Sequence, residues 1–377
     1  MTTASVSLRV LLASVTLTVA AAMAVAHDDD RDDNHHGDRP DQFYTNKRLV
    51  SNGAFPANFT DPHLKNAWGV AFNPQGFVWV ADADGNVSTL YDGTGQPSPQ
   101  PTPLVVAIPG PNGTPGNPTG IVFSAGADFV VTKGGVSGPA RFIFATEQGN
   151  LAGWAPNVDA THAVFVPKDA SDTDEDGYTG LALSGNGSTH LLYAANFRQA
   201  RVDVFDGAFK PVSVPGHFRD PRLPGRYAPF GIQAINGDLY VTYAKQDESG
   251  DEEVQGQGLG FVNVFDPDGR LLRRVVSRGP LNAPWGLALA PESFGKFGGA
   301  LLVGNLGDGT INAFGPLTGR FLGSLRDGNN KRLHIDGLWG IQFGNGILSQ
   351  KTNQLFYAAG PNDEEDGVYG VITAVTQ

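Results

Sequence analysis

The stretch Asn66-Ala67-Trp68-Gly69-Val70-Ala71-Phe72 decides the fold, because related stretches return five more times along the chain. Each copy places a glycine directly before a short apolar run, and the glycines lie at positions 69, 120, 180, 231, 286 and 340. The intervals between them run from 51 to 60 residues. A recurrence of about 50 residues is typical of a propeller or a solenoid.

Further apolar runs follow each copy and alternate with turn residues rich in Asp, Gly and Pro. The runs are short, with period-2 alternation of β-branched and aromatic residues, which predicts strands and not helices. In the second unit we expect the second strand at Phe129-Val130-Val131. Six units of four strands predict an all-β fold, a six-bladed β-propeller with four-stranded blades. A sandwich and a solenoid are the alternatives, and a sandwich would not repeat one glycine motif six times.

The last unit contains only three clear strands of its own. We therefore expect an N-terminal strand, at residues 48–51, to pair with the C-terminal blade and close the ring. Such a closure protects the edges of both strands.

The N-terminal region is not expected to belong to the propeller. Residues 1–26 combine Arg9, an apolar stretch and the small residues Ala24-Val25-Ala26, which indicates a cleaved signal peptide and a secreted protein, periplasmic or extracellular. An uncleaved membrane anchor is the alternative reading. Residues 27–42 are acidic and rich in histidine and should be a disordered tail. Residues 43–377 should form a single β-propeller domain.

The composition of the chain limits the classes of partner that it can be expected to bind. The chain has no cysteine and a formal net charge of −12 at pH 7. An acidic body disfavours nucleic acid and anionic membranes as partners. We expect a small molecule or an extracellular protein as partner, no nucleic acid, and no membrane insertion once the signal is cleaved.

Aromatic residues precede four of the six motif glycines. Because loops entering the first strand of each blade open on one side of a propeller, we expect these residues at one mouth of the channel. They could form a collar that stacks on a ligand. They could equally pack between blades as structural wedges. The candidate ligand-binding residues of this collar are Trp68, Phe230, Trp285 and Trp339.

Polar residues end several second strands, which open on the same side. Asp82, Asn196 and Asn305 are the candidates, with Thr132 in the second unit. Oxygen atoms that converge on a channel can hold a hard cation such as calcium. Asp and Asn are also ordinary turn residues that bond their own backbone.

Acidic loops gather on this face as well, among them the second-to-third strand loops that hold Glu252, Glu253 and Glu364. The run Asp172-Thr173-Asp174-Glu175-Asp176-Gly177 has Asp at alternate positions followed by Gly, as in the first half of a calcium loop. The twelfth position is Leu183 and not Glu, so this is not an EF-hand. Asp172, Asp174 and Asp176 are candidate ligands for calcium, which is the candidate cofactor, and an acidic surface turn is the alternative.

The repeats resemble NHL-type propeller blades through Trp79-Val80-Ala81-Asp82 and Val202-Asp203-Val204-Phe205-Asp206. From Leu49 to Val375 the chain resembles a family of secreted bacterial propeller proteins of unknown function. It is more distantly similar to the gluconolactonase and strictosidine-synthase-like propellers. That resemblance implies a channel calcium held by Asn196, Asn305 and Asp82, although none of the six first strands supplies the glutamate that those hydrolases use.

No catalytic motif is visible, so the sequence leaves open whether the protein is an enzyme. We expect a secreted binding propeller that recognises a small ligand or protein on its acidic, aromatic-rich channel face, assisted by calcium. The alternative is a calcium-dependent hydrolase of the lactonase or esterase type.

Overall fold

The computed structural model of the protein describes residues 42–168, 174–185 and 190–376, and the structural statements below refer to these. The expected signal peptide, nearly all of the expected tail, and Asp172 lie outside the described residues. No helix within the described part has the length and apolar character needed to cross a membrane.

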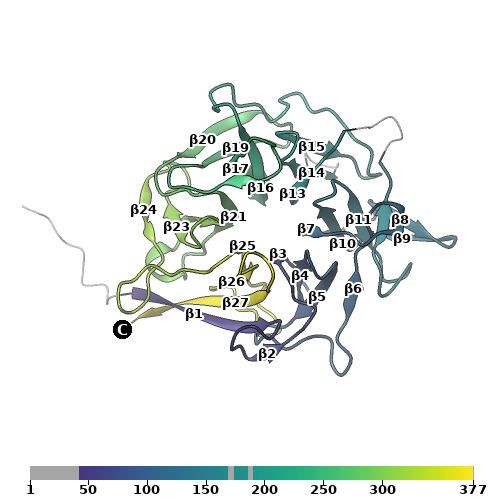
Figure 1. Cartoon of the computed structure of the whole chain (residues 1–377), viewed down its shortest axis with the longest axis horizontal. Helices are drawn as coiled ribbons and strands as arrows, with labels where there is room; N and C mark the ends of the chain where they lie inside the picture. The colour runs from purple at the N-terminus through teal and green to yellow at the C-terminus, as the bar shows by residue number, and fades with distance from the viewer. Residues whose placement is uncertain (1–41, 169–173, 186–189, 377) are drawn as a thin grey trace, which may run out of the picture. The chain divides into compact units, whose positions relative to one another are not determined.

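Six antiparallel sheets surround a central axis as the blades of a propeller (Figure 1). In blade 1 the strands, from the axis outward, are β3 (Ala67–Phe72), β4 (Val78–Asp82), β5 (Val87–Tyr91) and β6 (Val105–Ala107). Blade 2 contains β7 (Pro118–Phe123), β10 (Phe142–Thr146), β11 (Leu151–Trp154) and β12 (Val164–Val166). Blade 3 contains three described strands, β13 (Tyr178–Gly185), β14 (His190–Asn196) and β15 (Arg201–Phe205).

The second half of the ring is built in the same way. Blade 4 contains β16 (Tyr227–Ile235), β17 (Asp238–Gln246), β19 (Phe261–Phe265) and β20 (Leu271–Ser277), with β18 (Glu253–Val254) added to β17. Blade 5 contains β21 (Pro284–Leu289), β22 (Leu301–Asn305), β23 (Ile311–Phe314) and β24 (Phe321–Ser324). Two short 3₁₀ turns, η1 (Pro111–Gly113) and η2 (Gly295–Phe297), lie between strands.

Blade 6 joins the two ends of the described chain. It contains β25 (Leu338–Phe343), β26 (Gln354–Ala359) and β27 (Val368–Thr376), and its outer strand is β1 (Gln42–Ser51). β1 runs antiparallel to β27, from Gln42 opposite Thr376 to Ser51 opposite Val368, and β2 (Phe59–Thr60) pairs with its end. The predicted ring closure is confirmed, with a strand that begins six residues earlier than expected.

One strand prediction was wrong. Val130 and Val131 belong to β8 (Val130–Lys133), which pairs only with β9 (Val136–Pro139) in a hairpin inserted between β7 and β10. The second strand of blade 2 is β10 instead. The apolar run at 129–131 resembles a blade strand because Phe129 and Val131 are buried, as the apolar residues of blade strands are.

The repeated glycines have a packing reason. A Cβ atom at Gly231 would lie 2.1 Å from the carbonyl oxygen of Trp285 in the next blade, and one at Gly340 would lie 2.5 Å from that of Trp68. The same kind of clash, with the following blade, would arise at Gly69, Gly120 and Gly286. At these five positions the innermost strands approach so closely around the axis that only glycine fits, whereas a Cβ atom at Gly180 would lie 3.2 Å from the nearest atom of the next blade.

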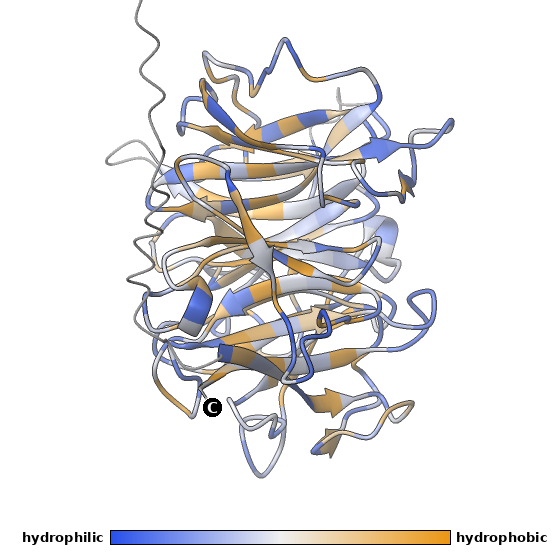
Figure 2. Ribbon diagram, turned by 90° about the vertical axis from the view of Figure 1, so that its left-hand side faces the viewer, coloured by the Kyte–Doolittle hydropathy of each residue, from blue (hydrophilic) through white to orange (hydrophobic). Residues whose placement is uncertain are grey.

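The apolar core lies between blades. The described buried residues form six clusters, one at each contact between neighbouring blades, and a seventh at the axis. Figure 2 shows apolar segments within the strands and mostly hydrophilic connecting loops. Burial of these faces stabilises the ring without disulfides, since the chain has no cysteine.

Candidate functional site

The four aromatic residues of the predicted collar meet at the axis, where they pack on one another. The ring centroid of Trp339 lies 3.9 Å from that of Trp68, 5.6 Å from that of Phe230 and 5.8 Å from that of Trp285. Trp68, Phe230 and Trp339 are 4%, 2% and 1% exposed. The collar is thus an interlocked plug in the channel, and the faces of its three buried rings are covered.

The two other motif positions tie neighbouring blades together. Thr119 Oγ1 donates to the carbonyl oxygen of Tyr178 at 2.7 Å, and Thr179 Oγ1 donates to that of Phe230 at 2.7 Å. Trp285 Nε1 donates in turn to the carbonyl oxygen of Thr179 at 2.9 Å. These residues fix the plug in the ring.

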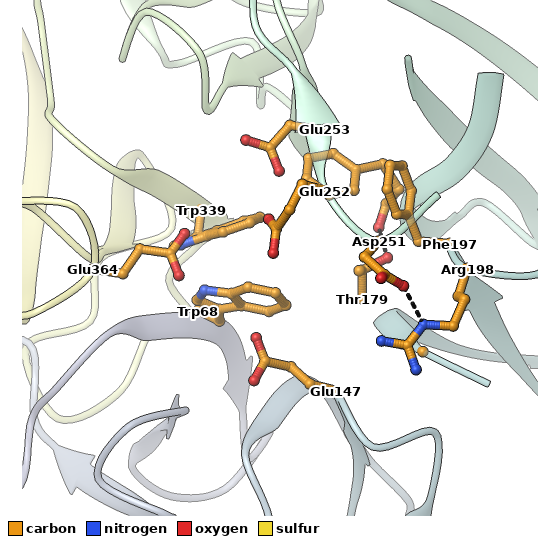
Figure 3. A pocket seen from close by; sticks show the side chains of 12 residues that line it. Trp68, Glu147, Thr179, Phe197, Arg198, Asp251, Glu252, Glu253, Trp339 and Glu364 are labelled. Atoms are coloured by element: carbon orange, nitrogen blue, oxygen red, sulfur yellow. Dashed lines mark hydrogen bonds and ion pairs between the residues drawn. The ribbon is translucent and has the colours of Figure 1, made fainter. Parts of the chain in front are cut away.

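A cavity of about 250 Å³ lies over the plug at the mouth of the channel. Its wall combines aromatic side chains with five carboxylates and one arginine (Figure 3). The lining residues are Trp68, Glu147, Gly177, Thr179, Phe197, Arg198, Phe230, Asp251, Glu252, Glu253, Trp339 and Glu364. We call this cavity the mouth pocket.

Four glutamates, which we call the mouth glutamates, reach the pocket from three different blades. Glu147 comes from the turn between β10 and β11, Glu252 from the loop after β17, Glu253 from the start of β18, and Glu364 from the loop after β26. Figure 3 shows their carboxylates arranged around the indole rings of Trp68 and Trp339. Within the described part of the chain, none of the four takes part in an ion pair.

The crowding of carboxylates has an electrostatic consequence. Burial, together with the charges of Asp84 and Glu252, raises the pKa of Glu147 to about 7. Burial also raises the pKa of Glu364 to about 7, although Asn66 Nδ2 donates to its Oε2 at 2.8 Å. Like charges and desolvation both disfavour the ionised form, so Glu147 and Glu364 keep their protons to a higher pH than a solvated glutamate does.

Arg198 is the single cationic side chain in the lining. Its Nε donates to Asp251 Oδ1 at 2.6 Å, and both side chains are partly exposed at the rim. Arg198 lowers the pKa of Glu147 but does not offset the effect of burial. It therefore leaves the mouth glutamates with an excess of negative charge.

Two buried donors also border the mouth pocket. Among the described residues, the indole Nε1 atoms of Trp68 and Trp339 have no hydrogen-bond acceptor. In Figure 3 both nitrogen atoms lie on the side of the pocket that Glu364 occupies. Buried indole N–H groups normally have a partner, so these two are exceptions that need an explanation.

The predicted strand-end residues do not line the mouth pocket. Asp82 is fully buried and accepts from Thr89 Oγ1 at 2.8 Å, and burial raises its pKa well above the usual range. Asn196 Nδ2 donates to Asp176 Oδ1 and Asp203 Oδ2, both at 2.7 Å. Asn305 Nδ2 donates to the carbonyl oxygen of Pro280 at 2.8 Å. Thr132, at the end of the misassigned strand, lies in the β8–β9 hairpin.

The acidic loop of blade 3 is paired with cations of the chain. Asp176 has a fully buried side chain and accepts from Lys168 Nζ and, at 3.1 Å, from Arg201 Nη2. Asp174 Oδ2 accepts from Arg201 Nη1 at 2.8 Å. Within the described residues, no three His, Cys, Asp or Glu side chains are grouped closely enough to hold a metal ion.

Sequence reasoning placed Glu252, Glu253 and Glu364 in acidic loops of the channel face but overlooked Glu147 as a site residue. The reason is that the incorrect second strand at 129–131 put the expected strand end at Thr132 instead of Thr146. A signal was present, because Thr146 ends β10 opposite Pro118 as Asp82 ends β4 opposite Ala67, and Glu147 follows directly in the turn after β10. Assignment of the second strand to residues 142–146 would have placed Glu147 in the turn beside the mouth.

Comparison with known sequences shows the family. The chain is 33% identical over 334 residues to Uncharacterized protein R648 of Acanthamoeba polyphaga mimivirus, covering 86% of this chain and 78% of the relative. It is 32% identical over 330 residues to Uncharacterized protein L690 of the same virus, covering 85% and 83%. The chain belongs to the family of these mimivirus proteins. No protein-family model matches it.

Among solved structures, one similar fold is a protein of unknown function from Bacteroides thetaiotaomicron VPI-5482. The TM-score is 0.52 at 12% identity, and the match covers 89% of this chain and 77% of that one. At this identity the similarity concerns the fold alone.

Proposed function

We propose that the protein is a binding propeller whose mouth pocket takes a small cationic ligand, held by the mouth glutamates. The observation that carries the proposal is that Glu147, Glu252, Glu253 and Glu364 share one cavity without an ion-pair partner among the described residues. A cation that enters relieves the repulsion between carboxylates and gains charge-assisted hydrogen bonds.

An organic cation fits this arrangement better than a single metal ion. The carboxylates surround a cavity of about 250 Å³, whereas calcium requires oxygens within 2.3–2.6 Å of one point. The covered faces of the plug offer little area for stacking, so the carboxylates supply the main attraction. Calcium remains a competitor that the test must include.

The alternative, a calcium-dependent lactonase or esterase, has less support. Its expected ligands Asp82, Asn196 and Asn305 make hydrogen bonds inside or between blades and do not line the mouth pocket. The blade 3 loop is a weaker calcium candidate for a similar reason, because Lys168 and Arg201 already neutralise Asp174 and Asp176.

Titration calorimetry of the full chain at pH 8 tests the proposal. The ligands are 1,4-diaminobutane, its uncharged counterpart 1,4-butanediol, and calcium chloride. We expect the diamine to bind, the diol not to bind, and Glu147→Gln or Glu364→Gln to weaken diamine binding about tenfold or more, because each removes one charged hydrogen bond.

Asp363→Asn is the matched control, because Asp363 is exposed, belongs to the same loop as Glu364 and does not line the pocket. It should change the affinity less than about twofold. Equal binding of diol and diamine, or equal effects of Asp363→Asn and Glu364→Gln, would contradict the proposal. Tight binding of calcium alone would restore the calcium-assisted alternative.

The setting that we propose is outside the cytoplasm, as in the secreted NHL-like propellers that the sequence resembles. The support is the signal-like pattern of residues 1–26. N-terminal sequencing of protein from the exported fraction should begin at His27. Protein that stays in the cytosol with residues 1–26 attached would contradict export.

A further inference from the structure

The mouth pocket carries information about its ligand beyond the charge. The inference about the ligand rests on the proposed function and concerns the two indole N–H groups beside the mouth glutamates. Trp68 and Trp339 are more than nine-tenths buried, line the pocket, and have no acceptor for Nε1–H within the described residues. A buried donor without a partner costs about 1–3 kcal/mol, so a ligand atom that accepts from these groups gains affinity.

The charge of the pocket limits which acceptor a ligand can offer. A carboxylate or phosphate on the ligand would face Glu147, Glu252, Glu253 and Glu364 and be repelled by them. A simple alkyl diamine has no acceptor when both of its nitrogens are protonated. Water bound to a metal ion is a poor acceptor, because one lone pair of its oxygen is directed to the metal and the cation withdraws electron density from the other.

A neutral hydroxyl oxygen satisfies all of these conditions. It accepts a hydrogen bond from an indole N–H and donates its own proton to a carboxylate. Glu364 is suitably placed for the second bond, because its Oε2 is already fixed by Asn66 and it lies on the side of both indole nitrogens (Figure 3). An ammonium group on the same molecule would meet the other mouth glutamates.

We propose that the mouth pocket binds a hydroxylated amine, an amino alcohol or amino sugar, with its ammonium group at the mouth glutamates and a hydroxyl oxygen at the indole N–H groups of Trp68 and Trp339. The assigned donors are Trp68 Nε1 and Trp339 Nε1. The plug thus has a second role, since it positions two donors at the base of a cation pocket.

Three six-carbon probes separate the two features of this ligand. D-glucamine carries an ammonium group and hydroxyls, hexylamine carries only the ammonium group, and D-sorbitol carries only hydroxyls. We expect glucamine to bind the full chain at pH 8 about fivefold to tenfold more tightly than hexylamine. Sorbitol should bind far more weakly than either.

Trp68→Phe and Trp339→Phe remove one donor each and keep an aromatic ring in the plug. Either variant should weaken glucamine binding about fivefold more than hexylamine binding, so that the preference for glucamine is lost. Melting curves verify that both variants fold. If one variant does not fold, the remaining variant and the comparison of the three probes on the parent protein still test the inference.

The failures are distinguishable. If hexylamine and glucamine bind equally and the tryptophan variants lose nothing, this inference is overturned while the proposed cation pocket stands. If neither amine binds, both fail. If sorbitol binds as well as glucamine, the site recognises neutral polyols, and both are again overturned.

Discussion

Two acidic regions of this propeller differ in where their counter-charges come from. In the blade 3 loop, Asp174 and Asp176 accept hydrogen bonds from Arg201 and Lys168. In the mouth pocket, the mouth glutamates face a cavity in which Arg198, the one lining cation, is bonded to Asp251 at the rim. The comparison teaches that a run of acidic residues is a candidate cation site only where the chain does not itself supply the cation.

The largest expected effect concerns the blade 3 loop. Asp176→Ala should lower the free energy of unfolding by about 3 kcal/mol, because it removes a buried carboxylate and leaves Lys168, Arg201 and Asn196 without that acceptor. Urea unfolding followed by tryptophan fluorescence measures this. Asp174→Ala is the control, because its half-exposed side chain should contribute less than about 1 kcal/mol. Equal losses in both variants would show that the loop is not the paired structural unit described here.

The next effect has the opposite sign and concerns the mouth pocket. The pKa of Glu147 is raised to about 7 in the folded state, so the folded state binds this proton more tightly than the unfolded state. Its contribution to stability therefore falls as the pH rises from about 4.5 to about 7 and is fully unfavourable above that. Glu147→Gln should stabilise the protein at pH 8 by about 2 kcal/mol and have little effect at pH 4.

Thermal melting at the two pH values measures the difference. Glu248→Gln, at an exposed position of the acidic loop after β17, is the matched control and should leave the melting temperature nearly unchanged at both. A Glu147→Gln variant that melts lower than the parent at pH 8 would contradict the unpaired, repelled state assigned to Glu147.

The smallest effect concerns Arg198. Replacement by Gln removes the one cation of the lining and frees Asp251, so the pocket becomes more negative. Binding of 1,4-diaminobutane at pH 8 should tighten about twofold to fivefold, as expected for a partly exposed charge. Weaker binding would mean that Arg198 contacts the ligand, and the comparison between the two regions would need revision.

The sequence predicted the ring because its deciding residue is set by the backbone. Glycine is required at positions such as 231 and 340 because a Cβ atom there would clash with the next blade. The same requirement returns in successive blades, so glycine recurs at regular intervals along the sequence. The β8–β9 hairpin was not predicted, because Phe129 and Val131 are buried as blade residues are, and only its pairing partners reveal that it is an insertion.

The candidate site was harder to predict because it depends on distances between blades. The four aromatic motif residues do meet at the axis, but their spacing along the chain does not tell whether they leave an open collar or cover one another. Likewise, Asp176 and Glu147 are both plain acidic loop residues in sequence. The structure distinguishes them, because Asp176 forms ion pairs with Lys168 and Arg201. Glu147 forms no ion pair with any described residue.

The central claim is that the mouth glutamates bind a cation that does not belong to the chain. The most direct test is the affinity of the full chain for 1,4-diaminobutane at pH 6 and at pH 8, a range in which an alkyl ammonium stays charged. Because Glu147 and Glu364 have pKa values of about 7 and must lose their protons to bind the ligand, the account predicts binding at least about tenfold tighter at pH 8. An affinity that does not change with pH, or that is higher at pH 6, would contradict it.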